Sequence, residues 1–276
     1  MFMQLWASDR PAVAPETMAG MADLPTGYRL YDQLAAWWPL ISPPEAYLDD
    51  AAQASALLRS ASIPVRDVLE LGSGGGHLAV HLSSDYTMTL VDLSASMLEM
   101  SRRLNPACEH RQADMRTARL GRTFDGVLVH DALDYMTTET DLADVVATAH
   151  AHCRPGGVAL FVPDVITETY APSSGGGGST GDDGRAAYFQ ERSWDPDPHD
   201  TWTLTEYRFL LRTADGSERT ERETHRMGVF PRAVWLRLLT EVGFTPEIVP
   251  ETAPGDRTPR ELFVAYRPTP IDPVQC

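Results

Sequence analysis

Four short runs of apolar residues recur in the first 165 residues, and helical patterns separate them. The runs cover residues 65–71, 88–92, 124–130 and 158–164. In the intervals, apolar residues recur every three or four positions, which is the period of an amphipathic helix. Buried-type strands that alternate with such helices are typical of a parallel sheet covered on both faces. We therefore expect an α/β fold with a doubly wound sheet.

Residues typical of helix N-termini precede the predicted helices. Ser94 stands in N-cap position before one of them, and residues 138–141 form a capping box before another. A further helix is predicted before the first strand, with Ser42 as its N-cap, Pro43 in its first position and Glu45 closing the box.

The alternation ends after residue 165. Residues 171–186 contain four consecutive glycines and an Asp-Asp-Gly sequence, which predicts a flexible loop. A β-hairpin is expected next, turning at Asp215-Gly216, and then a helix that begins at Pro231. Two final strands, near residues 245–249 and 261–266, would complete the main sheet. Residues 165–230 are thus predicted to be an insertion after the fifth strand.

Composition and charge exclude several kinds of chemistry and partner. The net charge is −16, and all 23 basic residues are arginine, so lysine chemistry is excluded and nucleic acid is an unfavourable partner. No apolar run is long enough for a membrane span, and the first ten residues lack a secretory pattern. Three widely spaced cysteines argue against a disulfide framework. These features predict a cytoplasmic protein without membrane or nucleic-acid partners.

The strongest chemical signal is a glycine-rich turn directly after the first strand. Glu70 is followed by Gly72, Gly74 and Gly76, and such a turn lets a ligand approach the backbone closely. Asp92 ends the second strand, twenty residues beyond Gly72, where an acidic residue can bind a ribose diol.

Two cofactor classes use this layout. The nicotinamide fingerprint requires a third glycine at position 77, where this chain has His77. The motif instead resembles that of class I S-adenosylmethionine-dependent methyltransferases, with further similarity at Gln112-Ala-Asp114-Met115, in the strand 124–130, and in Arg154-Pro-Gly-Gly157.

The resemblance implies a Rossmann-like seven-stranded methyltransferase sheet, six strands parallel and the last antiparallel, with the β-hairpin insertion after strand five. It divides the chain into an N-terminal helical cap segment (1–60), an S-adenosylmethionine-binding core (61–164), the insertion (165–230) and a C-terminal helix and strands completing the core (231–276). The cofactor-binding residues that it implies are Glu70, Gly72, Gly74, Gly76, Asp92, Leu93, Met97, Asp114, Met115 and His130.

The acceptor is expected to be a small molecule. Strand four ends in His130-Asp131-Ala132-Leu133 and lacks the Asn/Asp-Pro-Pro-aromatic motif of the nucleic-acid amino-methyltransferases. The N-terminal Tyr28-Arg-Leu-Tyr31-Asp32 and Trp37-Trp38 loosely resemble the aminosugar and glycine-type N-methyltransferases. Nitrogen is therefore slightly favoured as the methylated atom, and an O-methyltransferase is the alternative.

His130 is the candidate catalytic base, because the end of strand four faces the transferred methyl in this family and histidine takes a proton near neutral pH. Tyr31 is a candidate orienting partner. His225 is a rival base, although it is expected to be an exposed strand residue. His150, His152 and Cys153 lie at a helix C-terminus without further ligands, so no metal is expected.

Two functions of other classes stay open at this stage: a nicotinamide-dependent oxidoreductase, and a non-catalytic protein that binds S-adenosylmethionine. A homodimer is a further expectation, because the unpaired strand edge of the predicted hairpin favours pairing with a second copy.

We expect the substitution Asp92→Ala to raise the dissociation constants of S-adenosylmethionine and S-adenosylhomocysteine at least tenfold. The variant loses the acceptor of two ribose hydroxyls, and hydrogen bonds to a charged group contribute roughly 1.5–3 kcal/mol each. Titration calorimetry measures both constants. Unchanged affinity in the variant would remove Asp92 from the cofactor site.

Overall fold

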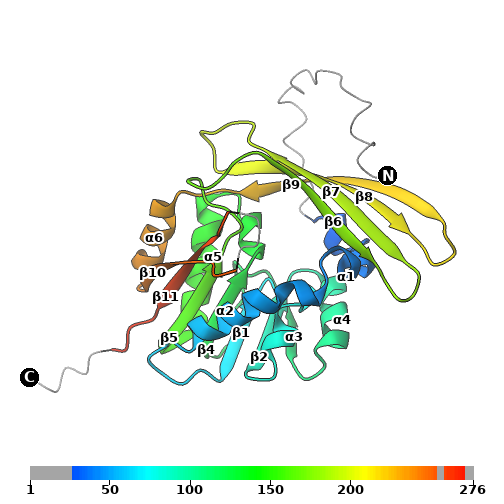
Figure 1. The fold of residues 1–276 in the computed structure, drawn as a ribbon. Helices are drawn as coiled ribbons and strands as arrows, with labels where there is room; N and C mark the ends of the chain where they lie inside the picture. Colours follow the sequence, from blue (N-terminus) through cyan, green and yellow to red (C-terminus); the bar gives the residue numbers. More distant parts are fainter. Residues whose placement is uncertain (1–26, 254–257, 271–276) are drawn as a thin grey trace, which may run out of the picture.

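The computed structural model describes residues 27–253 and 258–270, which form two β-sheets with helices around the first (Figure 1). The main sheet has seven strands in the order β10-β11-β5-β4-β1-β2-β3. Strands β1 to β5 run parallel, and β11 is antiparallel to both of its neighbours, β5 and β10. The predicted sheet of six parallel strands and one antiparallel strand is confirmed. Its strands are β1 (Asp67–Leu71), β2 (Thr87–Asp92), β3 (Glu109–Gln112), β4 (Phe124–His130), β5 (Cys153–Val162), β10 (Thr245–Pro250) and β11 (Glu261–Tyr266).

Helices cover both faces of this sheet, as a doubly wound fold requires. On one face, α5 (Glu139–His152) and α6 (Arg232–Glu241) bury side chains such as Val145 and Trp235 against Phe161. On the other face, α2 (Leu48–Leu58) and α3 (Ala79–Leu82) pack against Val68 and Leu128. The burial of apolar side chains on both faces explains why the central strands read as continuous apolar runs.

The predicted caps are confirmed at two helices and wrong at one. Ser94 Oγ accepts a hydrogen bond from the Met97 amide at the start of α4 (Ala95–Leu104), and Thr138 caps α5 in the same way. The predicted helix start at Ser42 is the wrong one, because α2 begins only at Leu48. There a 3-10 turn, η4 (Pro44–Tyr47), precedes α2, and Pro43 is extended because a residue before proline avoids the helical region. The Ser42 hydroxyl instead pairs with the Tyr47 hydroxyl at 2.9 Å.

The described part of the N-terminal segment is a series of short turns. It contains η2 (Arg29–Tyr31), η3 (Ala35–Trp37) and the single-turn helix α1 (Trp38–Ile41). Leu30 and Trp37 are buried here, and they pack with Phe209 and Leu211 of the second sheet. The segment therefore joins the insertion to the rest of the molecule.

The insertion is a four-stranded antiparallel sheet in the order β6-β7-β8-β9 (Figure 1). Its strands are β6 (Ser173–Thr180), β7 (Ala186–Trp194), β8 (Trp202–Arg212) and β9 (Glu218–Gly228). The predicted hairpin at Asp215-Gly216 corresponds to β8 and β9. The predicted flexible loop at 171–186 is wrong. Strand β6 pairs with β7 along its whole length, and Gly175–Gly178 take part in this pairing. A ladder of backbone hydrogen bonds needs no side chains, so composition alone misjudged this segment.

Gly228 allows the second sheet to approach the main one. A Cβ at this position would lie 1.8 Å from the carbonyl oxygen of Met136, which directly follows the 3-10 turn η5 (Ala132–Tyr135) after β4. Only glycine fits where β9 meets η5, so this contact determines how closely the two sheets pack.

We expect Gly228→Ala to lower the free energy of unfolding by about 1–3 kcal/mol, the usual cost of overpacking. Denaturant unfolding measures this loss. Gly27→Ala is the control, because no described atom lies within 4 Å of a Cβ placed there. Equal stability of Gly228→Ala and the parent protein would show that the two sheets can separate at no cost.

Candidate active site

The glycine turn after β1 has the backbone of a ligand-binding loop. Gly72, Gly74 and Gly76 have φ values of 74°, 52° and 75°, which side chains other than glycine rarely adopt. A Cβ on Gly72 would lie 2.3 Å from the Cβ of Ala132, and one on Gly75 would lie 3.2 Å from Trp38. The loop is therefore a bare stretch of backbone between η5 and the N-terminal segment.

Glu70 lies directly before this loop and is buried. Its Oε2 atom has no hydrogen-bond partner among the described residues, and burial raises the pKa of Glu70 to about 8. Burial thus disfavours the charged form of Glu70, and a cationic group of a bound ligand beside Oε2 would stabilise that form.

Asp92 lies beside the loop at the end of β2. Its carboxylate accepts hydrogen bonds from the amides of Gly74 at 2.7 Å and Ser94 at 2.8 Å. Burial raises the pKa of Asp92, while these backbone bonds act in the opposite direction. A carboxylate has about four acceptor positions, so capacity is left for a hydroxyl donor. Leu93 next to it is 60% exposed, as an apolar contact for a flat ring would be.

Two buried methionines pack against the glycine loop. Met97 Cε lies 3.5 Å from the position of a Cβ on Gly74, and Met115 Sδ lies 3.5 Å from that of a Cβ on Gly72. The structure thus brings these two predicted residues to the glycine loop.

Asp114 is held by an arginine. Arg116 donates to both of its carboxylate oxygens and also to Asp141 at 2.6 Å. These hydrogen bonds lower the pKa of Asp114, so it is a carboxylate at neutral pH. Its role toward an adenine ring stays a prediction.

His130 ends β4 between two carboxylates. Nδ1 lies 3.1 Å from Asp131, and Nε2 lies 3.5 Å from Asp50 on α2. Burial alone would lower the pKa of His130, but the two carboxylates outweigh it and raise that pKa to about 10. An imidazolium already carries its proton at pH 7, so these surroundings oppose the predicted role of His130 as a base. Its predicted contact with the cofactor stays a prediction.

A network of charges surrounds His130 at the carboxyl ends of β4 and β5. The Arg260 guanidinium is buried and donates to Asp131 at 2.9 Å and to Glu251 at 3.0 Å, and it also pairs with Asp50. Asp164 donates its amide to Asp134, and burial together with the Asp164 carboxylate raises the pKa of Asp134. The network contains five acidic and two basic side chains, namely Asp50, Asp131, Asp134, Asp164 and Glu251, and His130 and Arg260.

Tyr31 is the first member of a buried chain of hydrogen bonds. Its hydroxyl lies 2.6 Å from that of Tyr135, which lies 3.0 Å from Nδ1 of His225. Nε2 of His225 is 3.5 Å from Glu223, and the ring stacks on Tyr28 at 3.9 Å. The expectation that His225 is exposed is wrong, because the N-terminal segment covers this face of β9 and leaves His225 fully buried.

Sequence reasoning missed Tyr135, Asp134 and Arg260. Tyr135 and Asp134 follow the end of β4 by a few residues, and this position is itself a signal for a site residue. Nothing near Arg260 in the sequence indicates its contacts, which reach back 129 and 210 residues.

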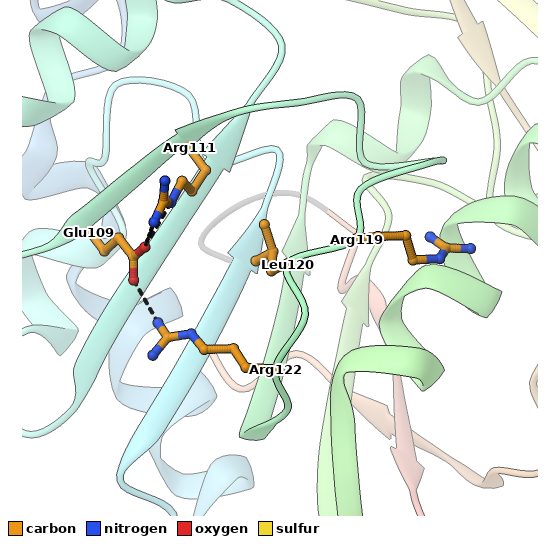
Figure 2. A pocket seen from close by; sticks show the side chains of 5 residues that line it. All are labelled: Glu109, Arg111, Arg119, Leu120 and Arg122. Atoms are coloured by element: carbon orange, nitrogen blue, oxygen red, sulfur yellow. Dashed lines mark hydrogen bonds and ion pairs between the residues drawn. The ribbon is translucent and has the colours of Figure 1, made fainter.

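Other candidate sites serve the fold. In the described residues, no group of three or more His, Cys, Asp or Glu is arranged to hold a metal. His152 bonds to the Thr148 carbonyl and the Leu120 amide. One cavity, of about 400 Å³, is lined by Glu109, Arg111 and Arg122. Glu109 already pairs with both arginines there (Figure 2). This cavity lies near the start of β3, whereas the glycine loop follows the end of β1. No described helix has the length and apolar character needed to cross a membrane.

Comparisons with known proteins find methyltransferases that resemble this chain in sequence and in fold. A family model described as a methyltransferase domain matches residues 68–157. The chain is 27% identical over 219 residues to a dTDP-3-amino-3,6-dideoxy-alpha-D-glucopyranose N,N-dimethyltransferase from Streptomyces fradiae, covering 79% of this chain and 83% of the relative. The crystal structure of DesVI from Streptomyces venezuelae matches with a TM-score of 0.72 at 26% identity, covering 80% of this chain and 92% of DesVI. CalS10 with bound S-adenosylmethionine, an amino pentose methyltransferase from Micromonospora echinaspora, matches with a TM-score of 0.69 at 26% identity, covering 89% and 99%.

The charge of His130 has a measurable consequence for stability. Its pKa is about 10 in the folded protein and about 6.5 when unfolded, so the folded state binds more protons between these values. The stabilisation is complete below pH 6.5 and is lost as the pH rises to 10. We expect the stability difference between the parent protein and His130→Gln to shrink from pH 7 to pH 10 in denaturant titrations.

His199→Gln is the matched control, because His199 is exposed and its replacement should have no pH-dependent effect in this range. A difference for His130→Gln that is constant with pH would mean that His130 is neutral in the folded protein.

Proposed function

We propose that this chain, which is a class I S-adenosylmethionine-dependent methyltransferase, methylates the amino nitrogen of a deoxy-aminosugar. The relatives support this acceptor, because the Streptomyces fradiae protein is named as an N,N-dimethyltransferase of a nucleotide-linked 3-amino sugar and CalS10 as an amino pentose methyltransferase. The nicotinamide alternative finds no support in the methyltransferase domain or in these relatives.

The observation that carries the proposal is the position of His130 between the carboxylates of Asp50 and Asp131, which raise its pKa. A hydroxyl acceptor needs a base, and the histidine at the end of β4 is already an imidazolium. A neutral amine carries its own lone pair and needs orientation more than deprotonation. The excess of carboxylates around His130 also attracts a cationic amine to this end of the sheet.

The described residues fit the cofactor. We propose that the unpartnered Oε2 of Glu70 binds its ammonium group, that Asp92 accepts from a hydroxyl of its ribose, and that Leu93 contacts its adenine. Bound S-adenosylmethionine supplies a methyl group on a positively charged sulfur. The glycine loop lets the backbone lie against it, and Trp38 shields the loop from water.

Tyr31 is proposed to orient the acceptor. Its hydroxyl belongs to the chain through Tyr135 to His225, so it can donate to or accept from an amine while its other bond is kept. Holding the nitrogen in line with the methyl group supplies proximity, which can contribute roughly 7–11 kcal/mol to lowering a barrier.

We further propose that the protein acts in the cytoplasm, without nucleic-acid or membrane partners, and forms a homodimer. The net charge of −16 and the free thiols of Cys108 and Cys153 support the first two points. The edge strands β6 and β9 support the third, since an unpaired edge can pair with a second copy.

The test is methyl transfer to dTDP-3-amino-3,6-dideoxy-α-D-glucopyranose, followed by mass spectrometry. We expect products with one and with two added methyl groups, and no product from the matched sugar that carries a hydroxyl in place of the amine. Tyr31→Phe should lower kcat/KM about 2- to 12-fold, because it loses a hydrogen bond of about 0.5–1.5 kcal/mol, with unchanged affinity for S-adenosylhomocysteine. Transfer confined to hydroxyl acceptors would overturn the proposal.

A further inference from the structure

A second cavity, of about 160 Å³, lies between the N-terminal segment and the second sheet. Aromatic rings form most of its wall, and one acidic side chain takes part. These residues are Tyr31, Trp38, Phe189, Tyr207, Phe209 and Glu191. An aromatic wall with a carboxylate is the arrangement that binds organic cations, through the ring faces and the opposite charge.

Glu191 differs from the other two carboxylates on this face of the sheet. In the strand register, Glu191 and Glu223 both lie opposite Tyr207, and Glu221 lies opposite Phe209. Glu221 pairs with the Arg29 guanidinium at 2.9 Å, and Glu223 accepts from the Arg29 and Leu30 amides. No described residue forms a hydrogen bond or an ion pair with the Glu191 carboxylate, whereas its backbone pairs within the sheet. Partial burial raises its pKa, as expected for a carboxylate without a cationic partner.

The glycine strand leaves room beside this carboxylate. A Cβ on Gly175 would lie 2.9 Å from Glu191 Oε1, and one on Gly177 would lie 3.2 Å from the Phe189 ring. Side chains at these positions of β6 would therefore press on the cavity wall. Because the glycines have no side chains, β6 leaves Glu191 and Phe189 uncrowded and still forms its full backbone pairing with β7.

The cavity also adjoins the glycine loop. Trp38 lines the cavity and is one of three side chains that a Cβ on Gly75 would meet at 3.2 Å. Tyr31 lines it too, and the Tyr31 carbonyl accepts a hydrogen bond from Ser94 at the start of α4. A ligand in the cavity would thus lie next to the proposed methyl donor.

We propose that this cavity is the subsite for the ammonium of the acceptor and for that of its methylated product, with Glu191 as the opposite charge. Before each transfer the acceptor's ammonium gives one proton to the Glu191 carboxylate, which frees the nitrogen lone pair, and the carboxyl group then releases that proton to solvent. The inference rests on the proposed function, because it names the residue that recognises the amine in the same site. Glu191 selects for amines over hydroxyls, since a neutral group would leave the carboxylate without a partner.

The test uses choline and its uncharged isostere 3,3-dimethylbutan-1-ol as probes. Each is titrated into the full chain saturated with S-adenosylhomocysteine, while tryptophan fluorescence is recorded, because Trp38 lines the cavity. We expect saturable binding of choline, at least tenfold weaker binding of the alcohol, and at least tenfold weaker choline binding by Glu191→Gln. Glu191→Asp keeps the charge and should bind choline better than Glu191→Gln does.

Glu218→Gln is the matched control, because it makes the same change at an exposed position of β9 and should leave choline binding unchanged. Equal binding of the two probes, or equal choline binding by the parent protein and Glu191→Gln, would overturn the inference. The choline titration is repeated without S-adenosylhomocysteine, and choline binding seen only in its absence would assign the cavity to the cofactor and overturn the inference as well. The two experiments can give different answers. If the sugar is not methylated but choline still binds in a Glu191-dependent way, the aminosugar is the wrong acceptor and the cation subsite stands.

Discussion

The burial of the Arg260 guanidinium is the constraint on which the carboxyl end of the main sheet depends. The side chain is only 5% exposed, and its charge must be neutralised where water cannot reach it. Its partners come from four places: Asp50 on α2, Asp131 after β4, Asp164 after β5, and Glu251 after β10. Removing Asp50, Asp131 or Glu251 would take a hydrogen-bond acceptor away from the buried guanidinium. The network therefore holds the end of β4 in one position, and Asp131 has a positive φ of 55° there.

The position of β4 then determines where the other parts of the site lie. The turn η5 follows β4 directly, and its Ala132 lies against Gly72 of the glycine loop. The same turn carries Tyr135, which connects Tyr31 of the N-terminal segment to His225 of the second sheet. Met136, one residue later, lies against Gly228. The glycine loop, the N-terminal segment and the inserted sheet thus meet at one turn, so a shift of β4 would disturb all three.

The sequence predicted the features that depend on neighbouring residues. The glycine loop, the Ser94 and Thr138 caps and the alternation of strands and helices are local, and their patterns were sufficient. The features that it missed depend on contacts across the chain. His225 is buried by the N-terminal segment, nearly 200 residues away, and His130 takes its charge partly from Asp50 on α2. The glycines of β6 form a strand only because β7 offers its backbone groups. None of these contacts has a local signature.

The sign of the local charge connects the fold to the choice of acceptor. Two unit charges 4 Å apart interact by about 4 kcal/mol at an effective dielectric constant of 20. An excess of carboxylates around β4 and the unpartnered Glu191 would oppose an alkoxide forming nearby by an energy of this order, and they would stabilise an ammonium product. A single neutral base could not offset that field for a hydroxyl acceptor, and His130 is not neutral. The same acidic side chains that neutralise Arg260 therefore favour methylation at nitrogen.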